Sequence, residues 1–192
     1  MKTGRAALII AFLASTAGAA MVAVTDVGAS KDATVVYTLA QCGDTPCTLI
    51  NHGMEPTLSA SLQDGEASRI LLGFTLPPGT TADGIASCQL QMQRPVQGPS
   101  EQYTLTASEA LGDWDQITVN GITDLPTGKT VGSVQSIGNA RPEPIDVTDA
   151  CKDAADAGNG GAFSLWVDSS GPAVMFPSMK TGAAATLRVF SA

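Results

Sequence analysis

Two tryptophans, Trp114 and Trp166, are the side chains best suited to hold a ligand, and the ligand they suit is a sugar. Sugar rings bind proteins by stacking their apolar C–H faces on aromatic planes, with polar groups around the rim. Trp166 alternates with Leu165 and Val167, so an extended backbone turns it away from the face that those two share. We predict that Trp166 is a sugar platform, unless a loop or a short helix covers it. Trp114 either binds the ligand as well or plugs one end of the core.

Four cysteines, Cys42, Cys47, Cys88 and Cys151, suggest two disulfides in an exported chain. Three pairings are possible. Glycine and proline lie between Cys42 and Cys47 and favour a tight loop, so the local pair is the easiest to close and leaves Cys88 with Cys151. A zinc site is the alternative interpretation, although Cys88 and Cys151 lack the neighbouring cysteine that is usual in zinc sites.

The acidic residues and the single histidine form no recognisable catalytic pattern. A glycosidase needs two carboxylates facing each other across a cleft, and no spacing among the 18 acidic residues marks such a pair. A serine nucleophile would need His52 as its base, but His52 lies in an Asn-His-Gly turn. We therefore predict that the protein is not an enzyme.

Several aspartates gather around residues 146–156, where the sequence predicts a short helix. Asp146 and Asp149 would lie in its first turn and complement the positive end of the helix. A structural calcium is the alternative, because calcium takes oxygen ligands from carboxylates and carbonyls. No Asp-x-Asp-x-Asp-Gly loop is present, so the sequence assigns no metal ligands.

Alternating apolar and polar residues mark the strands that must position these side chains. Clear alternation occurs at 33–39, 57–62, 69–76, 86–92, 102–107, 162–168 and 185–190, and weaker alternation at 129–137 and 172–176. Turn-forming residues separate these runs. The alanine-rich segment 147–157 predicts one short helix, with Asp146 or Thr148 as N-cap and Gly158 as its stop. The sequence thus predicts an all-β sandwich or barrel.

The first twenty residues resemble a secretory signal peptide. Lys2 and Arg5 precede the apolar run 6–13, which is followed by small residues up to Ala20. A retained membrane anchor is the alternative, but its alanine, glycine, serine and threonine content makes it a weak span. Removing Lys2 and Arg5 leaves 8 basic and 18 acidic residues, a net charge of −10. Such a charge argues against a nucleic-acid partner.

The order of motifs along the chain resembles the DNRLRE domain, also classed as carbohydrate-binding module family 96. The motifs that carry the resemblance are NHGMEPTLSA (51–60), RILLGFTLP (69–77), IASCQLQM (85–92), DWDQITV (113–119), IDVTDA (145–150), GGAFSLWV (160–167) and ATLRV (185–189). They span about residues 32–190. The chain departs from the family pattern at Val119, where a second tryptophan is usual, at Thr75, where an aspartate is usual, and at Lys180, near which an acidic residue is usual.

This resemblance implies a jelly-roll-like β-sandwich of about eight to ten antiparallel strands, extracellular and associated with carbohydrate. We expect a signal peptide at 1–20, no membrane span after its cleavage, and one domain at 30–192. The function expected is non-catalytic binding of a cell-wall or extracellular polysaccharide through Trp166 and Trp114. A structural or adhesive surface protein without sugar specificity is the alternative.

Overall fold

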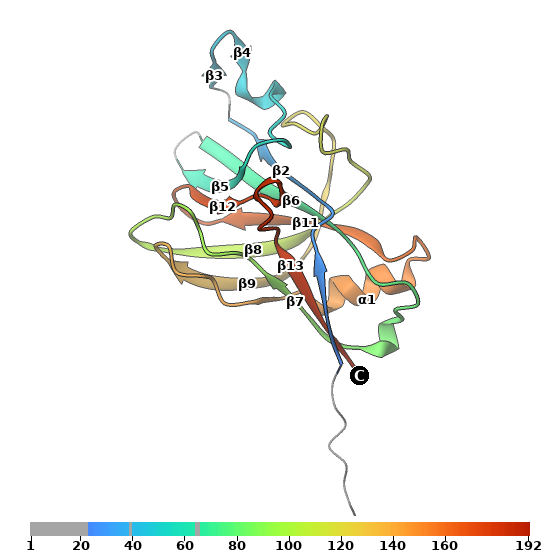
Figure 1. Cartoon of the computed structure of the whole chain (residues 1–192). Coiled ribbons are helices and arrows are strands. Elements are labelled where there is room, and N and C mark those ends of the chain that lie inside the picture. Colours follow the sequence, from blue (N-terminus) through green and yellow to red (C-terminus); the bar gives the residue numbers. More distant parts are fainter. Residues whose placement is uncertain (1–22, 39, 64–65) are drawn as a thin grey trace, which may run out of the picture.

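The computed structural model describes residues 23–38, 40–63 and 66–192, and the predicted signal peptide lies outside these ranges. The described chain forms an all-β sandwich with one α-helix, as the sequence predicts (Figure 1). Its strands are β1 (Val24–Gly28), β2 (Lys31–Val36), β3 (Gln41–Cys42), β4 (Thr45–Pro46), β5 (Thr57–Gln63), β6 (Glu66–Thr75), β7 (Ile85–Gln91), β8 (Gln102–Ala110), β9 (Thr127–Ile137), β10 (Ile145–Asp146), β11 (Ala162–Ser169), β12 (Val174–Pro177) and β13 (Thr186–Ser191). The helix is α1 (Thr148–Asp156), and short 3₁₀ turns cover Cys47–Leu49, Ala82–Gly84 and Met179–Thr181.

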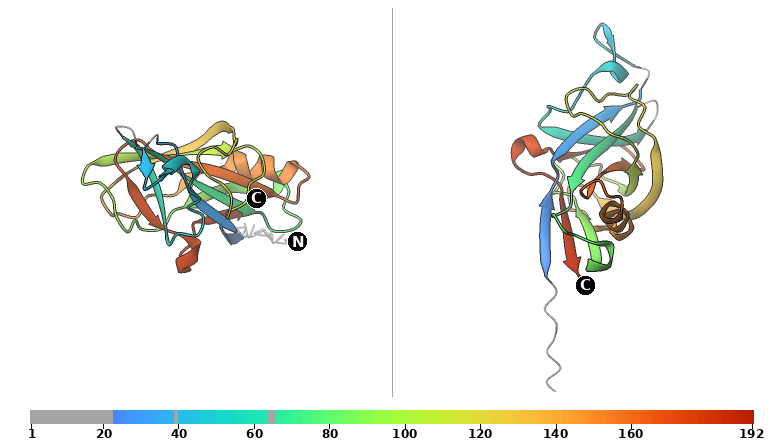
Figure 2. Two further views of the ribbon diagram at one scale, coloured as in Figure 1. Left: turned by 90° about the horizontal axis from the view of Figure 1, so that it is seen from above. Right: turned by 90° about the vertical axis from the view of Figure 1, so that its right-hand side faces the viewer.

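Two antiparallel sheets make the layers of the sandwich. The larger sheet has the order β12-β5-β6-β11-β8-β9, with β2 also paired to β6, and the smaller has the order β1-β13-β7-β10. The small β3–β4 hairpin projects from one end of the molecule, and α1 lies towards the opposite end (Figures 1 and 2). The connection between β8 and β9, residues 111–126, crosses the outer face of the larger sheet and is called the cover loop below.

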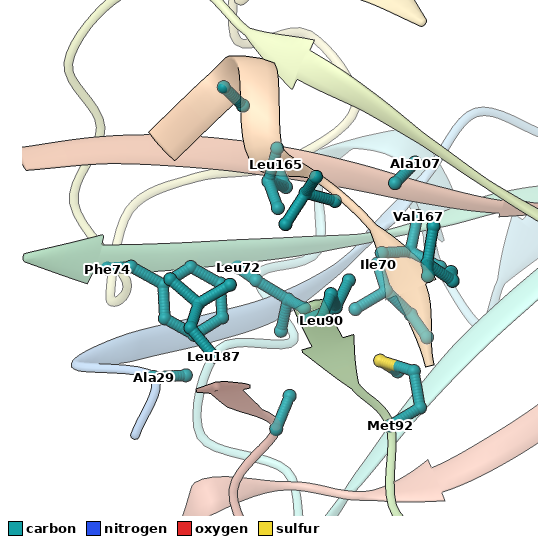
Figure 3. Packing of buried hydrophobic residues seen from close by; sticks show 14 of the residues in the cluster. Ala29, Ile70, Leu72, Phe74, Leu90, Met92, Ala107, Leu165, Val167 and Leu187 are labelled. Carbon is teal, nitrogen blue, oxygen red and sulfur yellow. The ribbon is translucent and has the colours of Figure 1, made fainter. Parts of the chain in front are cut away.

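The main core fills the space between the two sheets. Leu72 and Leu165 come from the larger sheet and Leu90 and Leu187 from the smaller, and all four are fully buried (Figure 3). Each belongs to a run in which every second residue is apolar, so the alternation places the whole set on the inner face. At roughly 25 cal/mol per Å² of apolar surface removed from water, this burial is the main force that holds the layers together.

All nine runs that alternate in the sequence are strands, with ends shifted by a few residues. The predicted start of the domain at residue 30 is wrong, because β1 begins at Val24 and pairs with β13. Most residues of β1 are exposed, and such a strand has no apolar alternation to reveal it. The two-residue strands β3, β4 and β10 are also missing from the prediction, since they are too short to show a period.

Both predicted disulfides are confirmed. Cys42–Cys47 closes the β3–β4 hairpin, and Cys88–Cys151 ties α1 to β7. Asp146 acts at the start of α1 as predicted, since its Oδ1 accepts the backbone N–H of Thr148 at 3.0 Å, although the N-cap position itself is Val147. Gly158 follows the helix with φ of 67°, a conformation that favours glycine and ends the helix.

Candidate functional site

Trp166 is buried, and the prediction that it forms an open sugar platform is wrong. The alternation turns it to the outer face of the larger sheet as expected, but its exposed fraction there is 0%. The guanidinium of Arg69 lies 4.4 Å from the centre of its ring, and the ring of Tyr37 meets it edge-on at 6.4 Å between centroids. A sugar therefore cannot stack on this indole.

The cover loop helps to bury Trp166. A second hydrophobic cluster forms on the outer face, separate from the main core, and contains Ala33, Val35, Leu71, Ala110, Trp114, Val119, Leu125 and Trp166. Three of these residues, Trp114, Val119 and Leu125, belong to the cover loop. Trp114 is 7% exposed, and its Nε1 donates a hydrogen bond of 2.8 Å to Ser164 Oγ in β11. Trp114 thus plugs a core, the second of the two interpretations, and is not a ligand contact.

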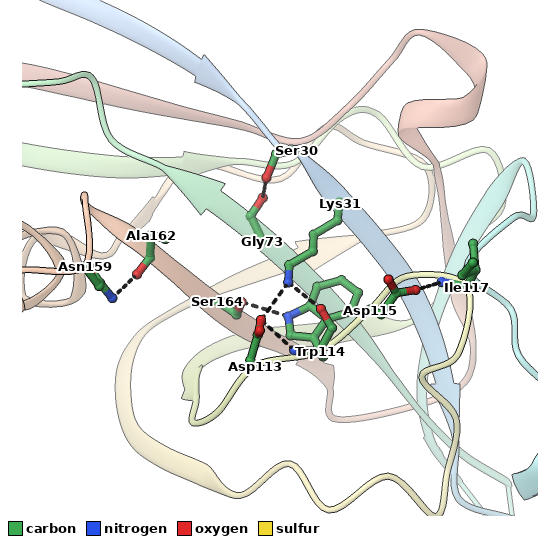
Figure 4. A network of polar contacts seen from close by, with 10 residues as sticks. All are labelled: Ser30, Lys31, Gly73, Asp113, Trp114, Asp115, Ile117, Asn159, Ala162 and Ser164. Atoms are coloured by element: carbon green, nitrogen blue, oxygen red, sulfur yellow. Dashed lines mark hydrogen bonds and ion pairs between the residues drawn. The ribbon is translucent and has the colours of Figure 1, made fainter.

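Lys31 holds one end of the cover loop in place (Figure 4). Its Nζ donates to the carbonyl oxygen of Trp114 at 2.6 Å and lies 4.4 Å above the indole, a cation–π contact. Asp113 adds an ion pair at 3.5 Å, and Asp115 accepts the backbone N–H of Ile117. The two carboxylates that flank Trp114 are therefore engaged in fixing the loop.

Gln116 holds the middle of the cover loop against the segment before β5. Its Nε2 donates to the carbonyl oxygen of Gly53 at 2.6 Å and to Asp32 Oδ1 at 3.2 Å. Asn51 Nδ2 in turn donates to the carbonyl oxygens of Gln116 and Val119. A Cβ atom on Gly53 would lie 1.8 Å from the carbonyl oxygen of Gln116, so this approach requires glycine.

Asp32 is the buried acid of this region, with 1% of its surface exposed. It accepts hydrogen bonds from Ser178 Oγ at 3.0 Å and from the backbone N–H of Met179 at 2.6 Å. Burial raises the pKa of Asp32 above its ordinary value, and these hydrogen bonds and the charge of Lys180 offset only part of that rise. Its partners make it a structural link between β2, the cover loop and the segment after β12.

Beside the cover loop, the outer face of the larger sheet opens into a cavity of about 680 Å³. Arg69 of β6 and Asp168 of β11 form a two-bond ion pair in this cavity, with Nε–Oδ1 at 2.6 Å and Nη2–Oδ2 at 2.9 Å. The third guanidinium nitrogen, Nη1, donates to Thr127 Oγ1 at 2.8 Å. Because its guanidinium also lies against the ring of Trp166, Arg69 is held by three side chains, those of Asp168, Thr127 and Trp166. We call this space the Arg69 cavity.

Hydroxyl side chains line much of the Arg69 cavity. They come from Tyr37, Thr106, Ser108 and Thr130, among others. Burial raises the pKa of the Tyr37 phenol, so that group stays protonated and able to donate at neutral pH. The cavity thus combines a cation, two carboxylates (Asp124 and Asp168) and neutral hydroxyls, which suits a ligand with many hydroxyl groups.

Sequence reasoning missed Arg69 and Asp168 as a site. Both lie in strands that the alternation predicts, and the same alternation turns both away from the core. Their contact, however, depends on the register in which β11 pairs with β6, with Val167 opposite Ile70. Arg69 and Asp168 are nearly a hundred residues apart in the sequence, and no local sequence pattern predicts the register of β11 on β6.

Acidic residues at and near α1 form ion pairs with a lysine and do not gather around a metal site. Lys129 Nζ lies 2.5 Å from Asp153 Oδ2 and 3.8 Å from Glu109 Oε1. The hydrogen bond that Lys129 donates to Asp153 is the main reason why the pKa of Lys129 is raised. Among the described residues, no group of three or more histidine, cysteine, aspartate or glutamate side chains is placed to hold a metal ion. The calcium predicted as an alternative therefore has no assigned ligands.

Comparison with known proteins identifies a relative of the same extracellular class. No protein-family model matches the chain. An "uncharacterized secreted protein" of Arthroderma benhamiae is 31% identical over 163 residues, which cover 77% of this chain and 81% of the relative. The described part of the chain contains no helix long and apolar enough to cross a membrane. Two disulfides and a secreted relative confirm the predicted extracellular location. The chain belongs to the same protein family as this secreted protein of Arthroderma benhamiae.

Proposed function

We propose that the protein is a secreted carbohydrate-binding module without catalytic activity, and that it binds a polysaccharide in the Arg69 cavity. The order of motifs that resembles the DNRLRE domain supports carbohydrate as the ligand class. The extracellular location supports it too, because polysaccharides of cell walls and matrices lie outside the cell. Relative to the prediction from sequence, the binding residues change from Trp166 and Trp114 to Arg69, Asp168 and the hydroxyls around them.

The single observation that carries this proposal is the Arg69–Asp168 pair on a hydroxyl-lined surface whose other charged residue is Asp124. A guanidinium offers only donors and a carboxylate only acceptors, so side by side they can bind neighbouring sugar hydroxyls in opposite senses. Support by Trp166 and Thr127 means that little side-chain entropy is lost on binding. The cavity offers a sugar little aromatic surface for stacking, because Tyr37 is the aromatic residue of its lining.

The charge of the protein favours a neutral polysaccharide. The residues after position 20 carry a net charge of −10, which repels uronate- or sulfate-rich polymers at long range. Within the Arg69 cavity Asp168 balances the charge of Arg69 and Asp124 adds a second carboxylate, so no surplus cation attracts an anionic chain. We therefore expect retention on neutral glucans, mannans or chitin rather than on pectin or alginate.

Retention on insoluble polysaccharides tests the proposal. Arg69→Ala and Asp168→Ala should each weaken retention at least about tenfold, which corresponds to ~1.4 kcal/mol. Arg188→Ala is the matched control, because Arg188 forms the same kind of pair with Asp26, at 2.9 and 3.3 Å, on the smaller sheet. Unchanged retention of Arg69→Ala, or equal loss in Arg188→Ala, would contradict this site. Absence of binding across a broad panel of neutral polysaccharides would overturn the function itself.

The proposal of a non-catalytic module is tested by the same panel. In the cavity near α1, both Glu109 and Asp153 bind Lys129, so neither is poised as a general acid. We expect no soluble reducing ends after prolonged incubation with any retained polysaccharide. Release that is lost in Glu109→Gln would show instead that the protein is a glycosidase.

An adhesive role is the second candidate, and a group of exposed aliphatic side chains favours it. Leu49, Met54, Ile117 and Ile122 are between 44% and 67% exposed. They lie on two loops joined by hydrogen bonds from Gly121 N to Thr48 O at 2.8 Å and from Gln116 Nε2 to Gly53 O at 2.6 Å. The combined change Ile117→Ser and Ile122→Ser should abolish self-association in sedimentation analysis if this role holds. A wild type that stays monomeric at high concentration would argue against it.

A further inference from the structure

We propose that the binding site extends from the Arg69 cavity into a second subsite at His52, so that its ligand is a linear chain of several sugars rather than a single terminal sugar. This inference rests on the proposed function and names the kind of ligand more closely. It depends on a second cavity, on the unsatisfied histidine that lines it, and on the residues that the two cavities share.

The second cavity has a volume of about 370 Å³ and adjoins the first. Ser61 and Ala67 line both, so the two cavities meet across β5 and β6. We call the second space the His52 cavity. Ala67 lies two residues before Arg69 on the outer face of β6, whereas Thr34, Val36 and Ser68 of the His52 cavity share the side of Ile70. A chain lying against Arg69 and Asp168 therefore passes into the second cavity around Ser61 and Ala67, which line both.

His52 lines this second cavity with one nitrogen unsatisfied. Its Nδ1 lies 2.6 Å from Glu55 Oε1, whereas its Nε2 is buried and has no partner among the described residues. The carboxylate of Glu55 can only accept, so Nδ1 carries the proton and Nε2 of the neutral imidazole is an acceptor. A buried acceptor without a donor costs free energy, and a sugar hydroxyl in the cavity would supply that donor.

The backbone around His52 holds the imidazole in place. His52 forms an isolated antiparallel bridge with Thr34 of β2, and Thr34 Oγ1 accepts the backbone N–H of Ser59. The Cys42–Cys47 disulfide closes the hairpin that borders the cavity. The ring is therefore presented by a fixed segment, and it need not be ordered when a ligand arrives.

The remaining lining of the His52 cavity matches an uncharged polyol. Hydroxyl residues such as Thr57 and Ser59 line it together with apolar residues such as Ala173 and Met175. Glu55 is the charged residue of the lining, and it already binds His52. A sugar ring, with hydroxyls at its edge and C–H groups on its faces, satisfies both kinds of wall.

Calorimetric titration with oligosaccharides of increasing length tests the second subsite. The series runs from disaccharide to hexasaccharide of whichever neutral polysaccharide the protein retains. Affinity of the wild type should rise with length, and His52→Phe should remove most of that rise, about tenfold for the hexasaccharide, while it leaves the disaccharide unchanged. Arg69→Ala should weaken every length, and Glu143→Gln, an exposed residue outside both cavities, should change none.

A second measurement keeps the test valid if His52→Phe folds poorly. His52 is the only histidine in the sequence, so its imidazole nuclear magnetic resonance signals are assigned without ambiguity in untagged protein. Adding hexasaccharide should shift the Nε2 signal, and adding disaccharide should leave it in place. An Nε2 signal that no length moves, together with a His52→Phe affinity equal to wild type, would overturn the second subsite while leaving the Arg69 site intact. If no oligosaccharide binds the wild type, the proposed function fails first.

Discussion

The two faces of the larger sheet are built on different principles. The inner face packs on the smaller sheet through apolar residues such as Leu72 and Leu165. The outer face is divided: one part is a small core closed by the cover loop, and the other is the open Arg69 cavity. A side chain that points outward from the sheet is therefore not necessarily exposed. Trp166 and Asp168 point the same way from β11, yet only Asp168 reaches the cavity.

The inner and outer cores should also differ in stability. The inner core is held by many strands at once, whereas the outer core depends on Trp114, Val119 and Leu125 from one irregular segment. Polar anchors at Lys31 and Gln116 replace the ladder of backbone hydrogen bonds that a strand would have there. We therefore expect the outer core to open locally at lower free energy than the inner one.

Trp166→Ala should cause the largest loss of stability in the outer core. Removing a fully buried indole leaves a cavity beneath Arg69 and Tyr37, and the expected loss is about 4 kcal/mol of unfolding free energy. Leu72→Ala on the inner face is the control and should cost about 3 kcal/mol. Urea unfolding measures both. If Trp166→Ala costs less than Leu72→Ala, the outer cluster is not a second core.

Periodicity in the sequence was enough to predict the inner face but not the outer one. Val167 and Ile70 lie in strands whose period is local, so the alternation identifies them as core residues. Trp166 and Trp114 meet through a loop that folds back from elsewhere in the chain, and the loop sequence has no period. The Cys42–Cys47 pair was predictable because its loop is short, whereas Arg69–Asp168 required a register across β6 and β11. Local patterns predicted elements, and contacts between distant segments decided the site.

Trp114→Phe tests whether the cover loop opens independently of the inner core. Phenylalanine keeps most of the apolar surface but loses the hydrogen bond to Ser164 and leaves that buried hydroxyl unpaired, at a cost of about 1–2 kcal/mol. Hydrogen exchange should rise in residues 111–126 and remain slow in β7 and β13. Uniform acceleration across both sheets would mean that the loop and the inner core unfold together.

Lys31→Met tests the polar anchor of the same loop with a smaller expected effect. Methionine retains the apolar stem and removes the bond to the Trp114 carbonyl and the contact with its ring, for an expected loss of about 1 kcal/mol. The ion pair with Asp113 adds little, because that carboxylate is fully exposed. Unfolding in high salt should therefore leave the difference between variant and wild type almost unchanged. A difference that vanishes in salt would assign the effect to the ion pair instead.

The pH dependence of stability should reveal Asp32, the buried anchor between β2 and Gln116. Burial raises the pKa of Asp32 above its ordinary value of 3.8, so the folded state keeps a proton that the unfolded state releases. The contribution of Asp32 is fully present below that ordinary value and declines as pH rises through the higher folded pKa. Asp26, whose pKa is lowered by Arg188, acts in the opposite sense, but it lies at the surface and its effect is small.

Asp32→Asn separates these two contributions. The amide oxygen can still accept from Ser178 and Gln116, while its NH2 group opposes the N–H of Met179, so the variant carries a penalty that does not change with pH. Urea unfolding from about pH 3 to about pH 7 should show the wild type losing stability relative to the variant as pH rises. The difference between the two curves isolates Asp32, because every other titrating group is common to both. Parallel curves would mean that Asp32 has the same pKa in the folded and unfolded chains, and that its hydrogen bonds fully compensate its burial.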